Sequence, residues 1–290
     1  MEVLVLTRFN LAIHANFAKL DKSEAKQNMT ADEIWLDENY LERRFEIFEK
    51  YTLNSLKRQK DQEFHWWVMF HEDTPQRFKD MISEYQKENS FFEAWYMDDE
   101  SSMKYSDKIS ERIRKEYNCK ELITIRLDND DAISSEFVQN TKMNFERHNC
   151  DVISYCEGAQ YNICTKRVTE SRQVNNHFLA FKCDVMCEDN HALKFDHSEV
   201  LSKYDNVFLD KKAKYQWLEV ISETNCVNLN HYRIVGLFHT YDIQKYYPFI
   251  MLPWNSKLGW FGYVVKNIFP TLFMELYVKL PYKIKERIGL

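Results

Sequence analysis

The sequence predicts an α/β fold, in which a mostly parallel β-sheet is flanked by helices. Apolar segments of strand length alternate with helical patterns four times before residue 150, and this alternation is typical of a sheet built from βα units. The fourth segment, at residues 122–127, is almost continuously apolar, as expected for a strand covered on both faces. Polar or acidic residues follow all four segments. Ligands bind beyond the carboxyl ends of such strands, so these residues mark the candidate functional edge.

The individual elements follow from hydrophobic periodicity. In the first predicted helix, Phe45, Phe48, Leu53 and Leu56 share one face, at the spacing of an amphipathic helix. After residue 150 the pattern becomes richer in strands, which we interpret as antiparallel additions to the first layer. The expected strands are residues 2–6, 64–70, 91–97, 122–127, 151–155, 159–164 and 178–183, and the expected helices are residues 41–59, 76–87, 104–117 and 134–147.

Composition excludes several classes of function. The 290 residues carry a net charge of −6, which argues against nucleic acid as the main partner because phosphate backbones require a basic surface. None of the five glycines precedes Gly158, so the first half contains neither a GxGxxG dinucleotide motif nor a GxxxxGK[ST] phosphate loop. The seven cysteines are scattered without a CxxC pair. We therefore expect reduced thiols in a cytoplasmic protein.

The chain divides by composition into a main domain, residues 1–256, and a helical C-terminal extension, residues 257–290. The extension is aromatic and carries six Lys or Arg against two acidic residues. A basic amphipathic helix suits an anionic membrane surface; the alternative is a helix pair packed on the protein's own core. We expect no signal peptide and no spanning helix. The expected location is the cytoplasm, with peripheral attachment to the inner face of the plasma membrane if the extension binds lipid.

Asp128, Asn129, Asp130 and Asp131 follow the fourth predicted strand and form the candidate site. Asp128 and Asp130 can both face one divalent cation, and oxygen ligands suit Mn²⁺ or Mg²⁺. The run does not fit an EF-hand calcium loop, because Ile133 stands where that loop requires Gly. A D-x-D pair at this point fits a metal that bridges the diphosphate of a nucleotide. The alternative is a solvated acidic turn before the next helix.

Four residues of the polar segment 184–206 could complete such a site. His197 could be a third metal ligand, since imidazole binds Mn²⁺. Glu188, Asp189 and Asp196 could each supply the general base that deprotonates an attacking hydroxyl. The alternative for all four is a solvated surface residue. Ser-His-Asp catalysis is not supported, because the sequence contains no GxSxG elbow.

Five stretches resemble the bacterial putative rhamnosyltransferase family, which are glycosyltransferases of the GT-A fold. Residues 125–132, IRLDNDDA, are close to the family's TRLDNDDA motif, and residues 44–59 are similar to its helix containing T-L-x-S-L-x-x-Q. The resemblance extends over roughly residues 3–230 and excludes the C-terminal extension. The other three stretches are LTRFN at 6–10, the strand and T-P turn at 67–75, and WLEVISETN at 217–225.

The resemblance implies a nucleotide-sugar donor, an Mn²⁺ or Mg²⁺ ion, and a glycan or lipid-linked acceptor. It implies that Asp128 and Asp130 bind the metal, and it supports His197 as a third ligand. Glu219 stands where the family usually has Gln, which changes the charge near the expected acceptor side. The residues expected to contact the nucleotide sugar are Thr7, Arg8, Arg44, Asp73, Arg126, Asp128 and Asn129.

The sequence is compatible with two functions. The first is a metal-dependent glycosyltransferase of bacterial surface polysaccharide synthesis, in which Arg8 or Arg126 helps the metal to neutralise the departing diphosphate. The second is a non-catalytic carbohydrate-binding or scaffold protein that keeps the fold. Stabilisation that requires both a nucleoside diphosphate and Mn²⁺ would favour the enzyme, because a ligand that binds only the native state raises the melting temperature.

Overall fold

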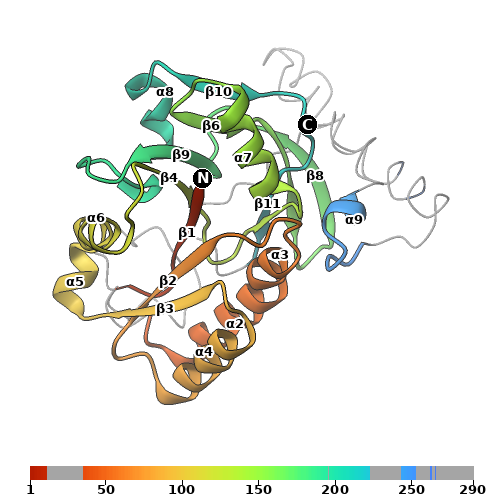
Figure 1. The fold of residues 1–290 in the computed structure, drawn as a ribbon. Coiled ribbons are helices and arrows are strands. Elements are labelled where there is room, and N and C mark those ends of the chain that lie inside the picture. Colours follow the sequence, from red (N-terminus) through yellow and green to blue (C-terminus); the bar gives the residue numbers. More distant parts are fainter. Residues whose placement is uncertain (12–34, 195, 223–242, 253–261, 263–264, 266–290) are drawn as a thin grey trace, which may run out of the picture.

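A seven-stranded mixed sheet lies at the centre of the computed structural model, with helices on both of its faces (Figure 1). The structure describes residues 1–11, 35–194, 196–222 and 243–252, together with Gly262 and Val265. The predicted α/β class, with a mixed sheet flanked by helices, is confirmed. In spatial order the strands of the main sheet are β10 (Val207–Asp210), β6 (Val152–Tyr155), β9 (Leu179–Asp184), β4 (Glu121–Arg126), β1 (Glu2–Arg8), β2 (His65–His71) and β3 (Phe92–Met97).

The directions of the strands create one functional edge. β4, β1, β2 and β3 are parallel neighbours, so their carboxyl ends lie together. β9 runs antiparallel between β4 and β6, which confirms the predicted addition to the first layer for residues 151–155 and 178–183. β10, in contrast, is parallel to β6. The strand predicted at residues 159–164 belongs to a second sheet instead. The Asp128–Asp131 run follows β4, and it therefore lies at the same edge as the last residues of β1 and β2.

Helices cover the two faces of the main sheet because successive side chains of a strand point to opposite sides. The described helices are α2 (Glu38–Ile47), α3 (Asn54–Lys57), α4 (Gln76–Glu88), α5 (Asp99–Met103), α6 (Tyr105–Glu116), α7 (Phe137–Arg147), α8 (Val200–Lys203) and α9 (Ile243–Tyr246). Val3 and Val5 of β1 belong to a core shared with α2, α4 and α7. Leu4 and Leu6 belong to the opposite core, which α6 completes.

The helix predicted at residues 41–59 contains a π-helical segment, Phe48–Leu53, between α2 and α3. Phe45 packs in the main core and stacks on Phe78 of α4, with ring centroids 5.0 Å apart. Ile47 and Tyr51 instead belong to a third apolar cluster. The single helical stretch therefore contributes side chains to two separate cores.

A second, four-stranded sheet begins directly after the acidic loop. The sequence predicted β7 with a shift of two residues, but it did not predict the other three strands or β10 of the main sheet. β8 has a single aliphatic residue, Val168, and β5 has only two residues, so neither carries a recognisable strand pattern. In spatial order this sheet consists of β5 (Ala132–Ile133), β11 (Trp217–Ile221), β7 (Glu157–Asn162) and β8 (Arg167–Arg172).

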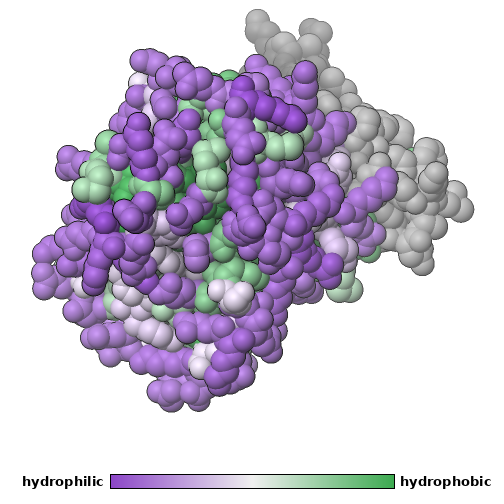
Figure 2. All heavy atoms as spheres, viewed as in Figure 1, coloured by the Kyte–Doolittle hydropathy of each residue, from purple (hydrophilic) through white to green (hydrophobic). Residues whose placement is uncertain are grey.

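The segment around α9 is the last continuous part of the chain that the structure describes, and it packs against the second sheet. The Tyr161 hydroxyl donates a hydrogen bond to the Met251 carbonyl (2.8 Å). The predicted boundary at residue 256 and nearly all of the C-terminal extension lie outside the described residues. Within the described part, no helix is both long and apolar enough to cross a membrane. Figure 2 shows one face of this part as mostly hydrophilic with small apolar areas.

Replacement of Gly158 by Ala is expected to destabilise the second sheet. A Cβ at this position would lie 2.1 Å from the Trp217 indole. Trp217 is fully buried and stacks on Phe178 at 5.0 Å, so it has no free space to move into. Overpacking of this kind costs about 3 kcal/mol, which urea unfolding would show as a lower midpoint. Gly262→Ala is the control, because its Cβ would meet nothing within 4 Å; equal midpoints for the two variants would contradict the prediction.

Candidate functional site

The acidic loop is anchored in the interior immediately beyond β4. The amide of Leu127 donates to the Leu6 carbonyl of β1 (3.1 Å). The carbonyl of Leu127 accepts a hydrogen bond from the Thr7 hydroxyl (2.7 Å), and the Trp66 indole donates to the same hydroxyl oxygen (2.9 Å). Thr7 is fully buried. Its hydroxyl thus fixes the start of the loop, instead of facing the open edge as expected for a nucleotide contact.

Three side chains converge beyond this anchor: Asp128, Asp131 and His177. They offer ligand atoms that lie within 4.8 Å of one another. Nε2 of His177 lies 2.7 Å from Oδ2 of Asp131, and Oδ1 of Asp131 accepts a hydrogen bond from the Val220 amide (2.8 Å). Two carboxylates and one imidazole form a donor set that suits Mn²⁺. The residues therefore fit the divalent ion that the family resemblance implies.

Arg126 controls the charge of Asp128. Its Nε and one terminal nitrogen donate to the two oxygens of Asp128 at 3.1 and 3.0 Å. Burial raises the pKa of Asp128, but the charges of Arg126 and His177 lower it by more, so the carboxylate stays ionised. Each carboxylate oxygen keeps a second lone pair for another partner. The Asp128 side chain is also 31% exposed, which makes it the accessible member of the cluster.

Asp131 and His177 form a buried, hydrogen-bonded pair. Burial lowers the pKa of His177, but the hydrogen bond and charge of Asp131 raise it by more. The pKa of His177 therefore lies above its ordinary value, and the pair holds a proton between its two members. A metal requires the neutral imidazole as its ligand, so this proton would leave when an ion binds. Without an ion, the proton supplies part of the positive charge that the carboxylates need.

Asp130 points elsewhere, into a buried contact with helix α2. Nη1 of Arg44 lies 3.1 Å from Oδ2 of Asp130, and the two side chains are only 8% and 13% exposed. Arg44 also donates a hydrogen bond to the side-chain oxygen of Asn129, whose own amide donates to the Phe9 carbonyl (2.8 Å). The structure thus gives Arg44, Asn129 and Asp130 a role in holding the loop. It does not bring Asp130 into the cluster around Asp128.

Two further predicted nucleotide contacts lie at the same edge of the sheet. Arg8 donates to the Tyr105 hydroxyl (3.2 Å), and its guanidinium lies 5.3 Å from the centre of that ring. Asp73, beyond the end of β2, is 71% exposed. Its backbone amide donates to Nδ1 of the buried His71 (3.1 Å). The Arg8 guanidinium is therefore held in place by Tyr105, whereas the Asp73 carboxylate is directed to solvent.

The four residues predicted from the segment 184–206 divide into two groups. The rings of His197 and His177 have centroids 5.9 Å apart, so His197 borders the cluster. Asp196 is 62% exposed, and its Oδ1 accepts hydrogen bonds from the amide and hydroxyl of Ser198. These hydrogen bonds lower the pKa of Asp196 and make it a weaker base. Glu188 and Asp189 are exposed on a separate loop, near α6.

The sequence analysis missed His177 and did not count Asp131 among the metal ligands. His177 comes 46 positions after Asp131, just before β9, and no motif or spacing connects the two residues. One signal was available for Asp131, its place in the acidic run after β4. The position of β11, which donates to Asp131 through Val220, could not be read from its sequence.

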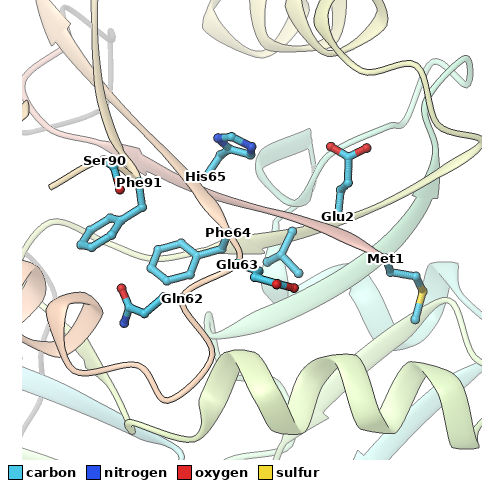
Figure 3. Close-up of a pocket in the computed structure, with 9 residues that line it drawn as sticks. Met1, Glu2, Gln62, Glu63, Phe64, His65, Ser90 and Phe91 are labelled. Atoms are coloured by element: carbon cyan, nitrogen blue, oxygen red, sulfur yellow. The ribbon is translucent and has the colours of Figure 1, made fainter.

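A separate cavity of about 340 Å³ lies at the opposite edge of the sheet. Figure 3 shows Glu2, His65, Phe64 and Phe91 among the side chains around it. These residues lie at the amino ends of β1, β2 and β3. Because the acidic loop follows the carboxyl end of β4, this cavity does not belong to the candidate site.

Residues 2–233 match the family described as Putative rhamnosyl transferase. The chain belongs to this family. The match includes the acidic loop, His177 and all strands of both sheets, and it confirms the resemblance seen in the motifs.

Solved structures add distant similarities to the rhamnosyl transferase match. The chain is 11% identical to S. aureus TarS 1–349, with a TM-score of 0.43, over 76% of this chain and 60% of TarS 1–349. For TarS 1–349 in complex with UDP-GlcNAc the identity is 10% and the TM-score 0.46, over 98% and 77% of the two chains. For the inositol-1-phosphate CTP transferase from T. maritima the identity is 12% and the TM-score 0.33, over 77% of this chain and 91% of the transferase. The chain thus spans about 60% of the first of these structures, and no curated protein matches it.

Removal of the Arg44 side-chain charge is expected to destabilise the loop and the whole fold. Arg44→Met keeps most of the apolar stem but leaves Asp130 buried without its cation. Breaking a buried ion pair in this way costs about 3 kcal/mol, which chemical denaturation would measure. The matched control is Arg43→Met, one position earlier on the exposed face of α2. A loss of similar size in both variants would show that the Arg44–Asp130 pair does not hold the loop.

Proposed function

We propose that this protein is a metal-dependent glycosyltransferase that moves a sugar from a nucleotide-diphosphate donor to a glycan or lipid-linked acceptor in surface polysaccharide synthesis. One observation carries the proposal: Asp128, Asp131 and His177 converge within 4.8 Å. They do so beyond the carboxyl end of a strand in an α/β sheet, where ligands bind. Family membership supplies the glycosyl transfer, and this cluster supplies the place for a divalent ion.

Asp128, Asp131 and His177 would hold the ion, instead of the set Asp128, Asp130 and His197 expected from the sequence. Asp130 is engaged by Arg44, and taking it away would leave a buried cation unpaired, which destabilises a fold. When bound, Mn²⁺ or Mg²⁺ would neutralise charge on the departing diphosphate. Asp131 would keep its bond to the Val220 amide, which fixes the carboxylate in position.

Arg8 and Arg126 would contribute fixed positive charge at the same edge. Arg126 is held by Asp128 and Arg8 by Tyr105, so neither guanidinium has to be ordered when a diphosphate arrives. Such preorganised charge stabilises a leaving group more effectively than mobile charge does. Asp196 is the best placed of the three predicted bases, because His197 beside it borders the cluster. Its lowered pKa makes it a weak proton acceptor.

The metal proposal predicts a thermal shift that needs two ligands at once. A panel of UDP, dTDP and GDP, each with and without Mn²⁺, should raise the melting temperature most when one nucleotide and the metal are both present. In Asp131→Asn and His177→Gln the metal-dependent part of the shift should disappear. Asn at position 131 still offers an oxygen to the Val220 amide, which protects the fold of that variant.

Three further variants show whether the effect is specific. His65→Gln changes an exposed histidine at the amino end of β2 and should keep the full shift. Asp130→Asn and His197→Gln test the metal set expected from the sequence. Both variants should keep the metal-dependent part of the thermal shift. A metal-dependent shift that survives in Asp131→Asn and His177→Gln but disappears in Asp130→Asn would contradict the assignment.

The C-terminal extension would bring the enzyme to a lipid-linked acceptor. Residues 257–290 carry six Lys or Arg and two acidic residues, and each basic residue near an anionic surface contributes about 1 kcal/mol of binding. Replacing all six by Gln should abolish sedimentation of the protein with vesicles that contain phosphatidylglycerol. Phosphatidylcholine vesicles are the control for charge. Equal sedimentation of the wild type with both kinds of vesicle would contradict a charge-driven membrane contact.

A further inference from the structure

Glu219 lies beside the metal cluster, in the middle of strand β11. Leu218 pairs with Ala132 of β5, and the Val220 amide donates to the carboxylate of Asp131. Glu219, between these two residues, is therefore next to Asp131 across the strand pair. The charge of Glu219 contributes to the raised pKa of Asp131, after burial and the charge of Asp130, which agrees with this closeness.

The side chain of Glu219 projects from the face of the second sheet that turns toward the site. Leu218 and Val220 belong to the apolar cluster on the other face, and side chains alternate along a strand. Trp217 therefore shares a face with Glu219, and its ring stacks on Phe178, the residue after His177 (5.0 Å, 11°). The side chain of Glu219 thus lies on the face of the sheet that is close to the metal cluster.

Gln160 of β7 holds the Glu219 carboxylate. The two residues are partners in the parallel pairing of β7 with β11, and Nε2 of Gln160 donates to Oε2 of Glu219 (2.7 Å). Glu219 is 8% exposed, whereas both of its strand neighbours are fully buried. In the part of the chain that the structure describes, no Lys, Arg or His forms an ion pair with it. A carboxylate this deep costs free energy unless it is paired or fully hydrogen-bonded.

We propose that Glu219, held by Gln160, accepts hydrogen bonds from hydroxyl groups of the acceptor sugar beside the metal cluster. This inference rests on the proposed function. Sugar hydroxyls can donate hydrogen bonds to this carboxylate, with which no cation of the described residues forms an ion pair. Hydrogen bonds to a charged acceptor are roughly twice as strong as neutral ones. Glu219 would determine which acceptor binds, while Asp128, Asp131 and His177 hold the donor side.

Sugar binding to the nucleotide-loaded protein tests this role. The protein is saturated with Mg²⁺ and the nucleoside diphosphate that gives the largest thermal shift. The probes are methyl α-L-rhamnopyranoside and methyl β-D-glucopyranoside, and saturation-transfer NMR measures their binding. We expect the wild type to bind at least one glycoside, Glu219→Leu to bind it at least about tenfold more weakly, and Glu219→Gln to bind it several-fold more weakly. The thermal shift with nucleotide and metal should persist in both variants.

The matched control is Glu170→Gln. Glu170 lies on β8 of the same sheet, opposite Ala159, whose side chain belongs to the other face, and it accepts a hydrogen bond from the Tyr215 hydroxyl. This variant should bind the glycoside as the wild type does. Unchanged binding in Glu219→Leu overturns the inference, and so does a wild type that binds nucleotide and metal but neither glycoside. Loss of the nucleotide shift in the wild type would instead reject the proposed function itself.

Discussion

The Asp131 carboxylate joins the parts on which the candidate site depends. One oxygen accepts a hydrogen bond from the Val220 amide of the second sheet, and the other lies 2.7 Å from Nε2 of His177. Asp131 itself belongs to the loop that follows β4 of the main sheet. A single side chain thus links the two sheets and orients the imidazole. Because the carboxylate is almost completely buried, its two partners have to be present whenever the protein is folded.

The parts of this arrangement that are local in sequence could be predicted, and the parts that depend on distant pairing could not. Alternating strands and helices, and the acidic run after β4, follow from periodicity and from the order of residues in the first half. The different contacts of the three aspartates could not be predicted in this way. Asp128 faces the open edge, Asp130 contacts Arg44, and Asp131 contacts His177. These directions are set by residues 46 to 89 positions away, which neither motif nor spacing connects to the loop.

The same distinction explains why the contacts of residues in the second sheet could not be predicted. Glu219 attracted notice in the sequence only as a change from the family's usual Gln. Its partner Gln160 and its place beside Asp131 depend on the pairing of β11 with β7 and β5. Short or polar strands such as β8 acquire their conformation from these neighbours rather than from their own composition. The side of the site that we propose for the acceptor is therefore built from the least predictable elements of the fold.

The winding of the π-helical segment Phe48–Leu53 affects the contacts that support the candidate site. A π-helical turn includes one residue more than an α-helical turn, and one residue corresponds to a rotation of about 100° around the helix axis. If the segment kept all of its residues and wound as a regular α-helix, its two ends would turn relative to each other. Arg44 would then leave Asp130, or Leu56 would leave the core. The wider turns of this segment thus allow one helical stretch to make both contacts.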